Sequence, residues 1–337
     1  MKEYNVAVLG ATGAVGQQMM KVLEERNFPV KRLLPLASAR SAGKQLAFRG
    51  KALTIEEATE VSFAGMDIVL GAVSNEMAKR FAPAIQDSGA VFIDNSSAFR
   101  LREDVPLVVP EINPEDAFQH HGIVANPNCS TIITMVALGG IRRLTAIDKM
   151  VACTYQAVSG AGQQGITELQ DQLRTVTLGE PVQPHVFPCQ IVSNVIPQIG
   201  SECDNGYTTE EMKMQNEGRK IMHLPELRVC CTCVRVPVMR SHSIAVQLVT
   251  RDPISVEDAR QAVAAAPGCV LTDDLDGRNY PTPLDTSDQD LVYVGRIRRD
   301  LISGDHGLAL WCCGDQVRKG AATNAVQIAE LLARGQA

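Results

Sequence analysis

The fold is decided by the stretch Asn5-Val6-Ala7-Val8-Leu9-Gly10-Ala11-Thr12-Gly13-Ala14-Val15-Gly16. An apolar run of strand type comes first, a glycine-rich turn follows it, and helical spacing begins at Ala14. Glycines at such a turn permit a tight bend and let a phosphate group approach the backbone N–H groups at the helix start. The spacing alone also fits a purely structural turn. Because it occupies the first strand-to-helix junction, we interpret it as a dinucleotide site.

The rest of the first third of the chain alternates strand and helix patterns. Apolar strand patterns recur at residues 32–37, 66–73 and 90–94, and helical spacing covers residues 14–26 and 76–86. Parallel neighbouring strands require crossover helices between them. The succession therefore predicts an α/β fold of Rossmann type, with a doubly wound parallel sheet.

After residue 129 the pattern changes. We expect strands at 149–158, 227–238, 243–250 and 308–313, helices at 164–178, 209–222, 255–266 and 321–333, and an irregular stretch at 179–206. The strands at 227–238 and 243–250 are joined by a short link and are predicted to face each other. These elements predict a second domain of α+β type on a mixed or largely antiparallel sheet.

Composition narrows the class of protein. The 337 residues carry a formal net charge of −6, which together with the lack of a dense Lys/Arg run argues against nucleic acid as a partner. No apolar stretch has the length of a membrane span. The first residues lack the apolar core of a signal peptide, so we expect a cytoplasmic protein. Its 10 cysteines are then predicted to be reduced thiols, and because their spacing offers no second zinc-ligand pair we expect no metal.

Cys129 is the candidate nucleophile. It follows Asn126-Pro127-Asn128 and precedes an apolar helical pattern that starts at Ile132. A thiol at a helix N-terminus meets the positive end of the helix dipole and unpaired backbone N–H groups, and both favour the thiolate. The same N–H groups suit the oxyanion formed when a thiolate attacks a carbonyl. A lone cysteine is more often a small buried side chain, but the polar residues of the second domain favour catalysis.

The end of the second strand indicates which nucleotide is bound. NAD-selective sites usually place an acidic residue there to bind the ribose hydroxyls. Here the strand runs into Ala37-Ser38-Ala39-Arg40-Ser41, without Asp or Glu. A guanidinium and hydroxyls suit a 2′-phosphate, whereas the alternative is a solvated basic loop. We predict NADP as the cofactor.

Three polar residues interrupt the apolar strands of the second domain. Gln156 precedes a glycine-rich turn, Arg235 lies within a β-type run, and His242 follows it. A cysteine and a histidine far apart in sequence are a candidate nucleophile and acid/base pair. Each also has a structural interpretation: a buried amide, an edge-strand arginine and a hydrogen-bonded histidine.

Five sequence blocks together resemble the aspartate-semialdehyde dehydrogenase family. They are residues 10–16, 126–131, 155–162, 210–213 and 233–238, which run in order along the chain. The resemblance implies NADPH-dependent reductive dephosphorylation of L-4-aspartyl phosphate to L-aspartate 4-semialdehyde, reversible, in the pathway to lysine, threonine and methionine. It implies that Cys129 forms a thioester, that His242 is the general acid/base and that Gln156 orients the acyl group.

The resemblance also assigns the substrate contacts. Arg235 matches the position that binds the α-carboxylate, and Arg100 and Lys213 match phosphate contacts, although Arg102 is close enough to confuse that assignment. Glu210 stands three residues before Lys213, so both are predicted to project from one helical face. Glu211 stands three residues after Thr208, which is the spacing of a capping box. We therefore predict that Glu210 binds the substrate amino group and that Glu211 has a structural role.

For the cofactor, the resemblance matches positions in four segments. They are Gly10, Thr12, Gly13, Ala14 and Val15 in the phosphate turn, Arg40 and Ser41 on the adenosine side, Ser159 and Gly160 under the nicotinamide, and Asn324 in the last helix. The last match implies that the final helix returns to the first domain. We therefore predict an NADP-binding domain of residues 1–128 and 315–337, and a catalytic and dimerisation domain of residues 129–314 that forms a homodimer.

Two other functions remain as alternatives. N-acetyl-glutamyl-phosphate reductase shares the architecture and the thiol chemistry, but an acetylated amine has no positive charge for Glu210 to meet. A catalytically silent relative that binds NADPH as a scaffold or sensor would be expected to lack the thiol, the histidine or the guanidinium, and all three are present.

Overall fold

The computed structural model describes residues 2–335. The chain divides into two compact units, the first made of residues up to 128 together with those from 321 onward, and the second made of residues 129–320. We had placed residues 315–320 with the first unit. They group with the second because Gln316 Oε1 accepts a hydrogen bond from Ser241 N–H at 2.9 Å, and because the Asp315 carboxylate pairs with Arg240.

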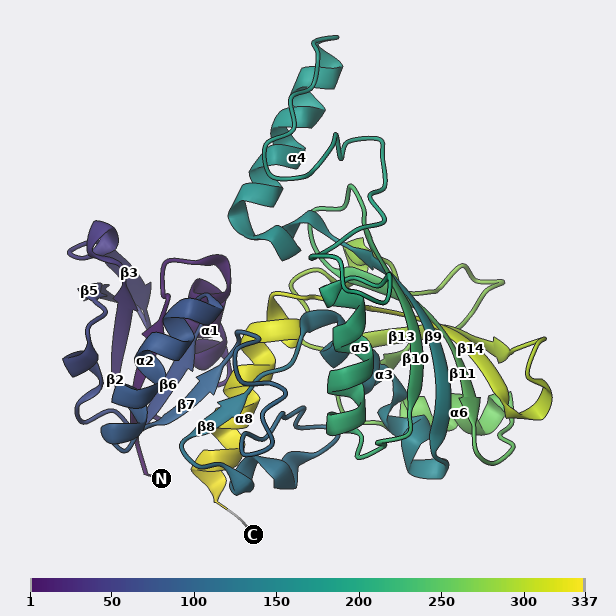
Figure 1. Ribbon diagram of the computed structural model, residues 1–337, viewed down its shortest axis with the longest axis horizontal. Coiled ribbons are helices and arrows are strands. Elements are labelled where there is room, and N and C mark those ends of the chain that lie inside the picture. The colour runs from purple at the N-terminus through teal and green to yellow at the C-terminus, as the bar shows by residue number, and fades with distance from the viewer. Residues whose placement is uncertain (1, 336–337) are drawn as a thin grey trace. The chain divides into compact units, whose positions relative to one another are not determined.

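A six-stranded parallel sheet forms the centre of the first unit. Its strands, in spatial order, are β5 (Glu56–Glu57), β2 (Val30–Ala37), β1 (Tyr4–Leu9), β6 (Ile68–Gly71), β7 (Val91–Asp94) and β8 (Ile123–Ala125). Helices α1 (Ala14–Glu25) and α8 (Thr323–Arg334) contribute to the apolar core on one face, and α2 (Asn75–Asp87) packs on β7 (Figure 1). The predicted Rossmann-type fold is confirmed.

The final helix does return to the first unit. Ala325, Val326 and Ile328 of α8 are fully buried in its core. The Arg26 guanidinium donates two hydrogen bonds of 2.7 Å to the Glu330 carboxylate, which fixes α8 beside the end of α1. The hairpin of β3 (Gln45–Phe48) and β4 (Lys51–Thr54) completes this unit.

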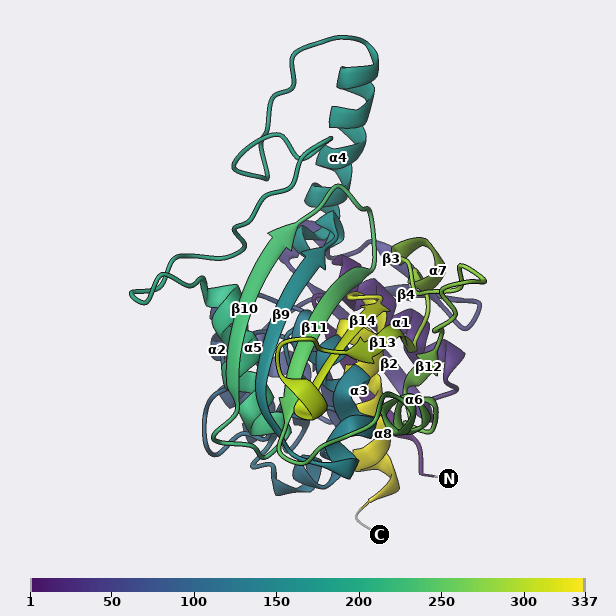
Figure 2. The same cartoon turned by 90° about the vertical axis from the view of Figure 1, so that its right-hand side faces the viewer.

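The second unit is built on a six-stranded mixed sheet. Its strands, in spatial order, are β10 (Arg228–Arg235), β9 (Ile147–Gln156), β11 (His242–Thr250), β14 (Gly307–Gly314), β13 (Val292–Arg299) and β12 (Cys269–Leu271). Helices α3 (Cys129–Leu144), α5 (Thr209–Ile221) and α6 (Val256–Ala264) pack against it, and the short helix α7 (Pro283–Thr286) contacts β14. Figure 2 shows these strands side by side, with α4 (Gly162–Thr177) and the irregular segment after it standing out from the sheet.

One strand pairing differs from our prediction. Strands β10 and β11 do not pair with each other, because β9 lies between them, parallel to β10 and antiparallel to β11. Alternating apolar residues show which face of a strand is buried but not which strand it pairs with. This order matters for the site. Gln156, at the end of β9, lies opposite Arg235 of β10, and β9 also neighbours β11, which begins at His242.

Strand β13 was not predicted. Its sequence Val292–Arg299 carries three arginines, and its pairing with β14 is interrupted between Gly295 and Arg298. Arg296 has a left-handed φ of 55° at that irregularity. The bulge breaks the two-residue alternation by which a strand is recognised in sequence.

Candidate active site

Cys129 is the first residue of α3, as predicted. The first turn of the helix has no acidic side chain, so nothing there offsets the positive end of the helix dipole. The thiol is partly exposed. The backbone of Gly320 lies against it, because a Cβ at Gly320 would be 2.9 Å from Cys129 Cβ. The glycine therefore makes room for the nucleophile.

His242 lies beside this sulfur. It is the first residue of β11 and is fully buried, and its Nε2 lies 3.5 Å from Cys129 Sγ. The backbone N–H of Ala157 donates a 3.0 Å hydrogen bond to Nδ1 of the same ring. Because Nδ1 accepts that bond, the proton of the neutral imidazole is assigned to Nε2. The ring therefore presents an N–H to the sulfur.

The surroundings keep His242 uncharged. The pKa of its imidazole is lowered to about 3, first by burial and then by the positive charge of Arg235, while the Glu210 carboxylate opposes the shift. Desolvation penalises the charged form of any buried base. At neutral pH the ligand-free protein therefore carries a neutral His242, which can stabilise a Cys129 thiolate by hydrogen bonding.

Arg235 is held above the turn that follows β9. Its Nη1 donates a 2.7 Å hydrogen bond to the carbonyl of Ala157. Burial lowers the pKa of its guanidinium, while Cys129 and Glu210 raise it. A Cβ at Gly160 would lie 2.6 Å from Arg235 Nη1 and 3.4 Å from His242 Cε1. Gly160 therefore allows the turn to approach both side chains.

Gln156, Glu210 and Lys213 form a chain of polar contacts. Gln156 Nε2 donates to Glu210 Oε1 at 3.2 Å, and Lys213 Nζ donates to Glu210 Oε2 at 2.8 Å. The two charged residues do project from one face of α5, as their spacing predicted. Gln156 Oε1 accepts a 3.0 Å hydrogen bond from the hydroxyl of Thr154, a residue that the sequence did not single out.

Glu211 is engaged in the capping box that its spacing predicted. Its Oε2 accepts the Thr208 N–H at 2.7 Å, and the Thr208 hydroxyl accepts the Glu211 N–H at 3.3 Å. Its other oxygen accepts the N–H of Cys233 at 3.0 Å. The side chain is buried and joins the start of α5 to the middle of β10.

A buried amide supports the entrance to β11. Gln316 accepts the N–H of Ser241 and donates to the hydroxyl of Ser159. Ser241 has a left-handed φ of 72° although it is not a glycine, and it immediately precedes His242. No sequence pattern predicts this contact, because Gln316 lies 75 residues beyond Ser241.

The glycine turn of the first unit has the features of an anion site. Gly10 has a φ of 90°, and a Cβ there would lie 2.3 Å from the carbonyl of Ala72. A Cβ at Gly16 would lie 2.2 Å from the carbonyl of Gly10. Gly13 caps α1 without a side-chain hydrogen bond, and Thr12 and Gly13 are exposed. Backbone N–H groups at an uncapped helix start suit a phosphate.

Arg40 and Ser41 follow β2 in a short 3₁₀ helix, Ala39–Ser41. Arg40 is exposed and Ser41 is buried. The edge strand β5 places Glu56 beside Leu36 and Glu57 beside Ala37. These carboxylates were not anticipated at the end of β2, because they come from a different part of the sequence.

Arg100 and Arg102, which the sequence could not separate, differ in their surroundings. Arg100 is buried, and it donates to the carbonyls of Asn126 at 3.0 Å and Asn95 at 2.7 Å. Arg102 is exposed and donates from Nε to Asp104 at 2.9 Å. Burial and a fixed geometry favour Arg100 as the anion-binding residue.

Asn324 lies inside the first unit. It is fully buried, and its Nδ2 donates to the carbonyl of Val108 at 2.9 Å and to Asn126 Oδ1 at 2.6 Å. It thus joins α8 to the segment that precedes Cys129 in the chain. A contact between Asn324 and the cofactor stays a prediction.

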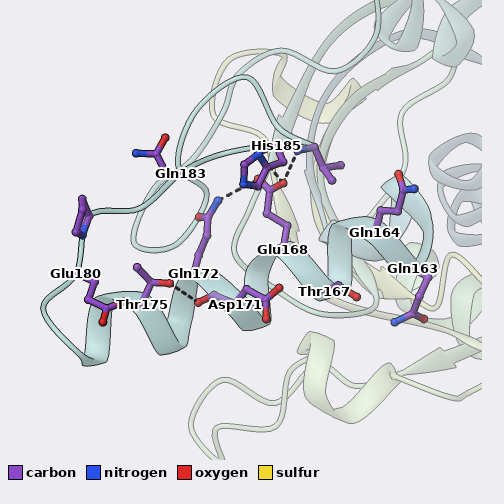
Figure 3. A pocket seen from close by; sticks show the side chains of 12 residues that line it. Gln163, Gln164, Thr167, Glu168, Asp171, Gln172, Thr175, Glu180, Gln183 and His185 are labelled. Carbon is purple, nitrogen blue, oxygen red and sulfur yellow. Dashed lines mark hydrogen bonds between the residues drawn. The ribbon is translucent and has the colours of Figure 1, made fainter.

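A separate cavity of about 490 Å³ lies along α4 (Figure 3). The Glu168 carboxylate in its wall accepts the backbone N–H groups of His185 and Val186, and Gln172 Oε1 accepts that of Ile191 at 2.9 Å. These side chains brace the irregular segment against the helix. The cavity is not lined by any of the predicted catalytic residues.

Residues 2–335 contain neither a metal-ligand cluster nor a membrane-spanning helix. No group of three or more His, Cys, Asp or Glu side chains in this range is placed to hold a metal ion. Likewise, none of the helices described is both long and apolar enough to cross a bilayer.

Comparisons with known proteins match this arrangement. A model of the semialdehyde dehydrogenase NAD binding domain matches residues 5–120, and one of the semialdehyde dehydrogenase dimerisation domain matches residues 138–319. The aspartate-semialdehyde dehydrogenase of Bacillus subtilis (strain 168) is 48% identical over 336 residues, covering 97% of this chain and 97% of that protein. The chain belongs to the aspartate-semialdehyde dehydrogenase family.

Other aspartate-semialdehyde dehydrogenases agree in sequence and in structure. That of Synechocystis sp. is 50% identical over 327 residues, which cover 97% of this chain and 96% of that protein. The crystal structure of aspartate semialdehyde dehydrogenase II from Vibrio cholerae superposes with a TM-score of 0.96 at 46% identity, with both chains fully covered. The chain is thus an oxidoreductase of this family, and the resemblance inferred from five sequence blocks is confirmed. The names of these relatives favour the aspartate-semialdehyde dehydrogenase family over N-acetyl-glutamyl-phosphate reductase.

Proposed function

We propose that the protein catalyses the NADPH-dependent reductive dephosphorylation of L-4-aspartyl phosphate to L-aspartate 4-semialdehyde, reversibly, through a thioester on Cys129. One observation carries the proposal: the Sγ of Cys129 lies 3.5 Å from Nε2 of a neutral, fully buried His242 in a chain of this family. A Vibrio cholerae relative, 45% identical, is known as a complex with ASA, which supports the same small substrate here.

The first step makes the thioester. The Cys129 thiolate attacks the acyl carbon, an S–C bond forms, and the bond to phosphate breaks with release of inorganic phosphate. Gln156 orients the acyl group through a hydrogen bond. Arg235 binds the α-carboxylate as a planar two-donor group, and Glu210 meets the ammonium. Arg100 and Lys213 bind the phosphate group.

The second step reduces the thioester. When bound, NADPH would supply the hydride that reduces the thioester carbon. His242, the proposed general acid/base, holds its Nε2 proton toward the sulfur as the thiohemiacetal collapses to the aldehyde and the free thiolate. A carboxylate bound to Arg235 offsets the charge that lowers the pKa of His242, so binding of substrate favours this acid/base role.

The first unit fits NADP. The glycine turn that includes Gly10 and the uncapped start of α1 at Thr12–Val15 suit its pyrophosphate. Arg40 and Ser41 suit the 2′-phosphate, since Arg40 is an exposed cation just after β2. In the family pattern Ser159 and Gly160 lie under the nicotinamide and Asn324 completes the contacts.

Assembly and cellular setting follow from the same proposal. A homodimer formed through the second unit is supported by the dimerisation-domain model that matches residues 138–319. None of the 10 cysteines, all within the described residues, forms a disulfide, which fits the reducing cytoplasm. There the product would serve the synthesis of lysine, threonine and methionine.

The test is reduction of NADP by L-aspartate 4-semialdehyde, with and without phosphate, by the wild type and Cys129→Ser. We expect phosphate-dependent reduction by the wild type and a loss of at least about 10³-fold in Cys129→Ser, because a serine hydroxyl is not ionised at neutral pH. A matched control is Cys269→Ser, a partly buried cysteine in β12, which should retain activity. Reduction without any need for phosphate would contradict the proposed reaction.

A further inference from the structure

Thr154 shares a buried face of β9 with Gln156. The two residues are two positions apart in the strand, so their side chains project to the same side. Thr154 is fully buried and Gln156 is 2% exposed. The Thr154 hydroxyl lies 3.0 Å from Gln156 Oε1. Neither the sequence motifs nor the proposed mechanism uses this hydroxyl.

The contacts at the other end of the amide define its orientation. Gln156 Nε2 lies 3.2 Å from Glu210 Oε1. An ionised carboxylate only accepts hydrogen bonds, so the NH₂ group, not the carbonyl, must face Glu210. Oε1 then faces Thr154, and the Thr154 hydroxyl must be the donor. The amide is thus held at both ends, and one N–H of Nε2 is left for a ligand.

We propose that Thr154 is a positioning residue that holds the amide of Gln156 with an N–H directed at the acyl oxygen of the substrate. This inference rests on the proposed function of Gln156. Without the hydroxyl, Oε1 is left buried without its donor, and the amide is held only by its contact with Glu210. The remaining N–H then loses its fixed direction toward the acyl oxygen, so the effect falls on the reaction step more than on binding.

The test compares Thr154→Val with Thr154→Ser in the phosphate-dependent oxidation of L-aspartate 4-semialdehyde. Valine keeps the shape and removes the hydroxyl, whereas serine keeps the hydroxyl. We expect Thr154→Val to lower kcat about tenfold with little change in KM, and Thr154→Ser to stay within about twofold of the wild type. A loss of equal size in both variants would overturn the proposal, because packing would then explain it.

The control variant is Thr250→Val. Thr250 is equally buried, lies at the opposite end of β11 from His242, and donates to the carbonyls of Asp252 and His306. Thr250→Val should lower the thermal midpoint, as the loss of any buried hydroxyl would, without lowering kcat. A drop in kcat in Thr250→Val that matches Thr154→Val would overturn the specific role of Thr154.

A double-mutant cycle separates action through Gln156 from an independent effect. In a Gln156→Ala background, Thr154→Val should cause no further loss of kcat, because the amide it positions is gone. A full tenfold loss in that background would refute the proposal. If Thr154→Val proves unfolded by circular dichroism, Thr154→Ala serves in the same cycle with the same expected result.

The outcome also distinguishes this inference from the function on which it rests. An active wild type whose kcat is unchanged in Thr154→Val refutes the positioning role alone. A wild type without phosphate-dependent NADP reduction refutes both.

Discussion

Glu210 and Glu211 are adjacent, yet the same substitution should have opposite consequences at the two positions. Glu211→Gln is expected to destabilise the second unit and leave turnover nearly unchanged. Glu210→Gln is expected to impair turnover and leave stability nearly unchanged. The reason is that Glu211 binds two backbone N–H groups, whereas Glu210 binds the side chains of Gln156 and Lys213.

The magnitudes follow from these contacts. In Glu211→Gln an NH₂ group replaces one carboxylate oxygen, so the N–H of Thr208 or Cys233 loses its acceptor. A buried donor without a partner costs about 1–3 kcal/mol, which for a protein of this size lowers the thermal midpoint by roughly 2 to 12 °C. Glu210→Gln removes a partly exposed ion pair worth about 0–1 kcal/mol. It also removes the charge opposite the substrate ammonium, which should lower kcat/KM roughly 10- to 100-fold.

The assay is a pair of measurements on each variant. Thermal unfolding is followed by circular dichroism, and kcat and KM are measured for L-aspartate 4-semialdehyde at saturating NADP and phosphate. Glu217→Gln on the same helix, also buried, is a control for any buried carboxylate. The reasoning fails if Glu211→Gln loses activity at an unchanged midpoint, or if Glu210→Gln melts early with normal kinetics.

Three further results are expected. Because His242 is buried in its neutral form, the free energy of unfolding should fall as pH drops from 6.5 toward 3. The unfolded ring gains a proton in this range, whereas the folded ring with its pKa of about 3 does not. Measured by urea unfolding, the free energy of unfolding of His242→Gln should fall by about 3 kcal/mol less than that of the wild type between pH 7 and 4.5. Gly160→Ala should raise KM for the semialdehyde about tenfold, because its methyl group would lie 2.6 Å from Arg235 Nη1, and an unchanged KM would show that the turn moves freely. Arg40→Ala should lower kcat/KM for NADP but not for NAD, and an equal drop for both would exclude a 2′-phosphate contact.

Local features of this protein were readable from its sequence. The capping box of Thr208 and Glu211 and the shared face of Glu210 and Lys213 depend on a three-residue spacing, which helix geometry fixes wherever a helix forms. The start of α3 at Cys129 was signalled by the apolar pattern after it. The glycine turn between β1 and α1 was likewise visible, because it depends on consecutive residues alone.

Contacts between distant segments were decided only by the tertiary structure. Cys129 and His242 are 113 residues apart in the sequence. The 3.5 Å distance between Cys129 Sγ and His242 Nε2 depends on how β11 pairs with its neighbours. The prediction that the strands at 227–238 and 243–250 face each other is wrong for the same reason, because β9 lies between β10 and β11. No spacing rule predicts the hydrogen bond from the Ala157 N–H to His242, which decides which ring nitrogen carries the proton. The same holds for the hydrogen bond from the Thr154 hydroxyl to Gln156. Residue types set the available chemistry, whereas strand order and burial set which groups meet and in which protonation state.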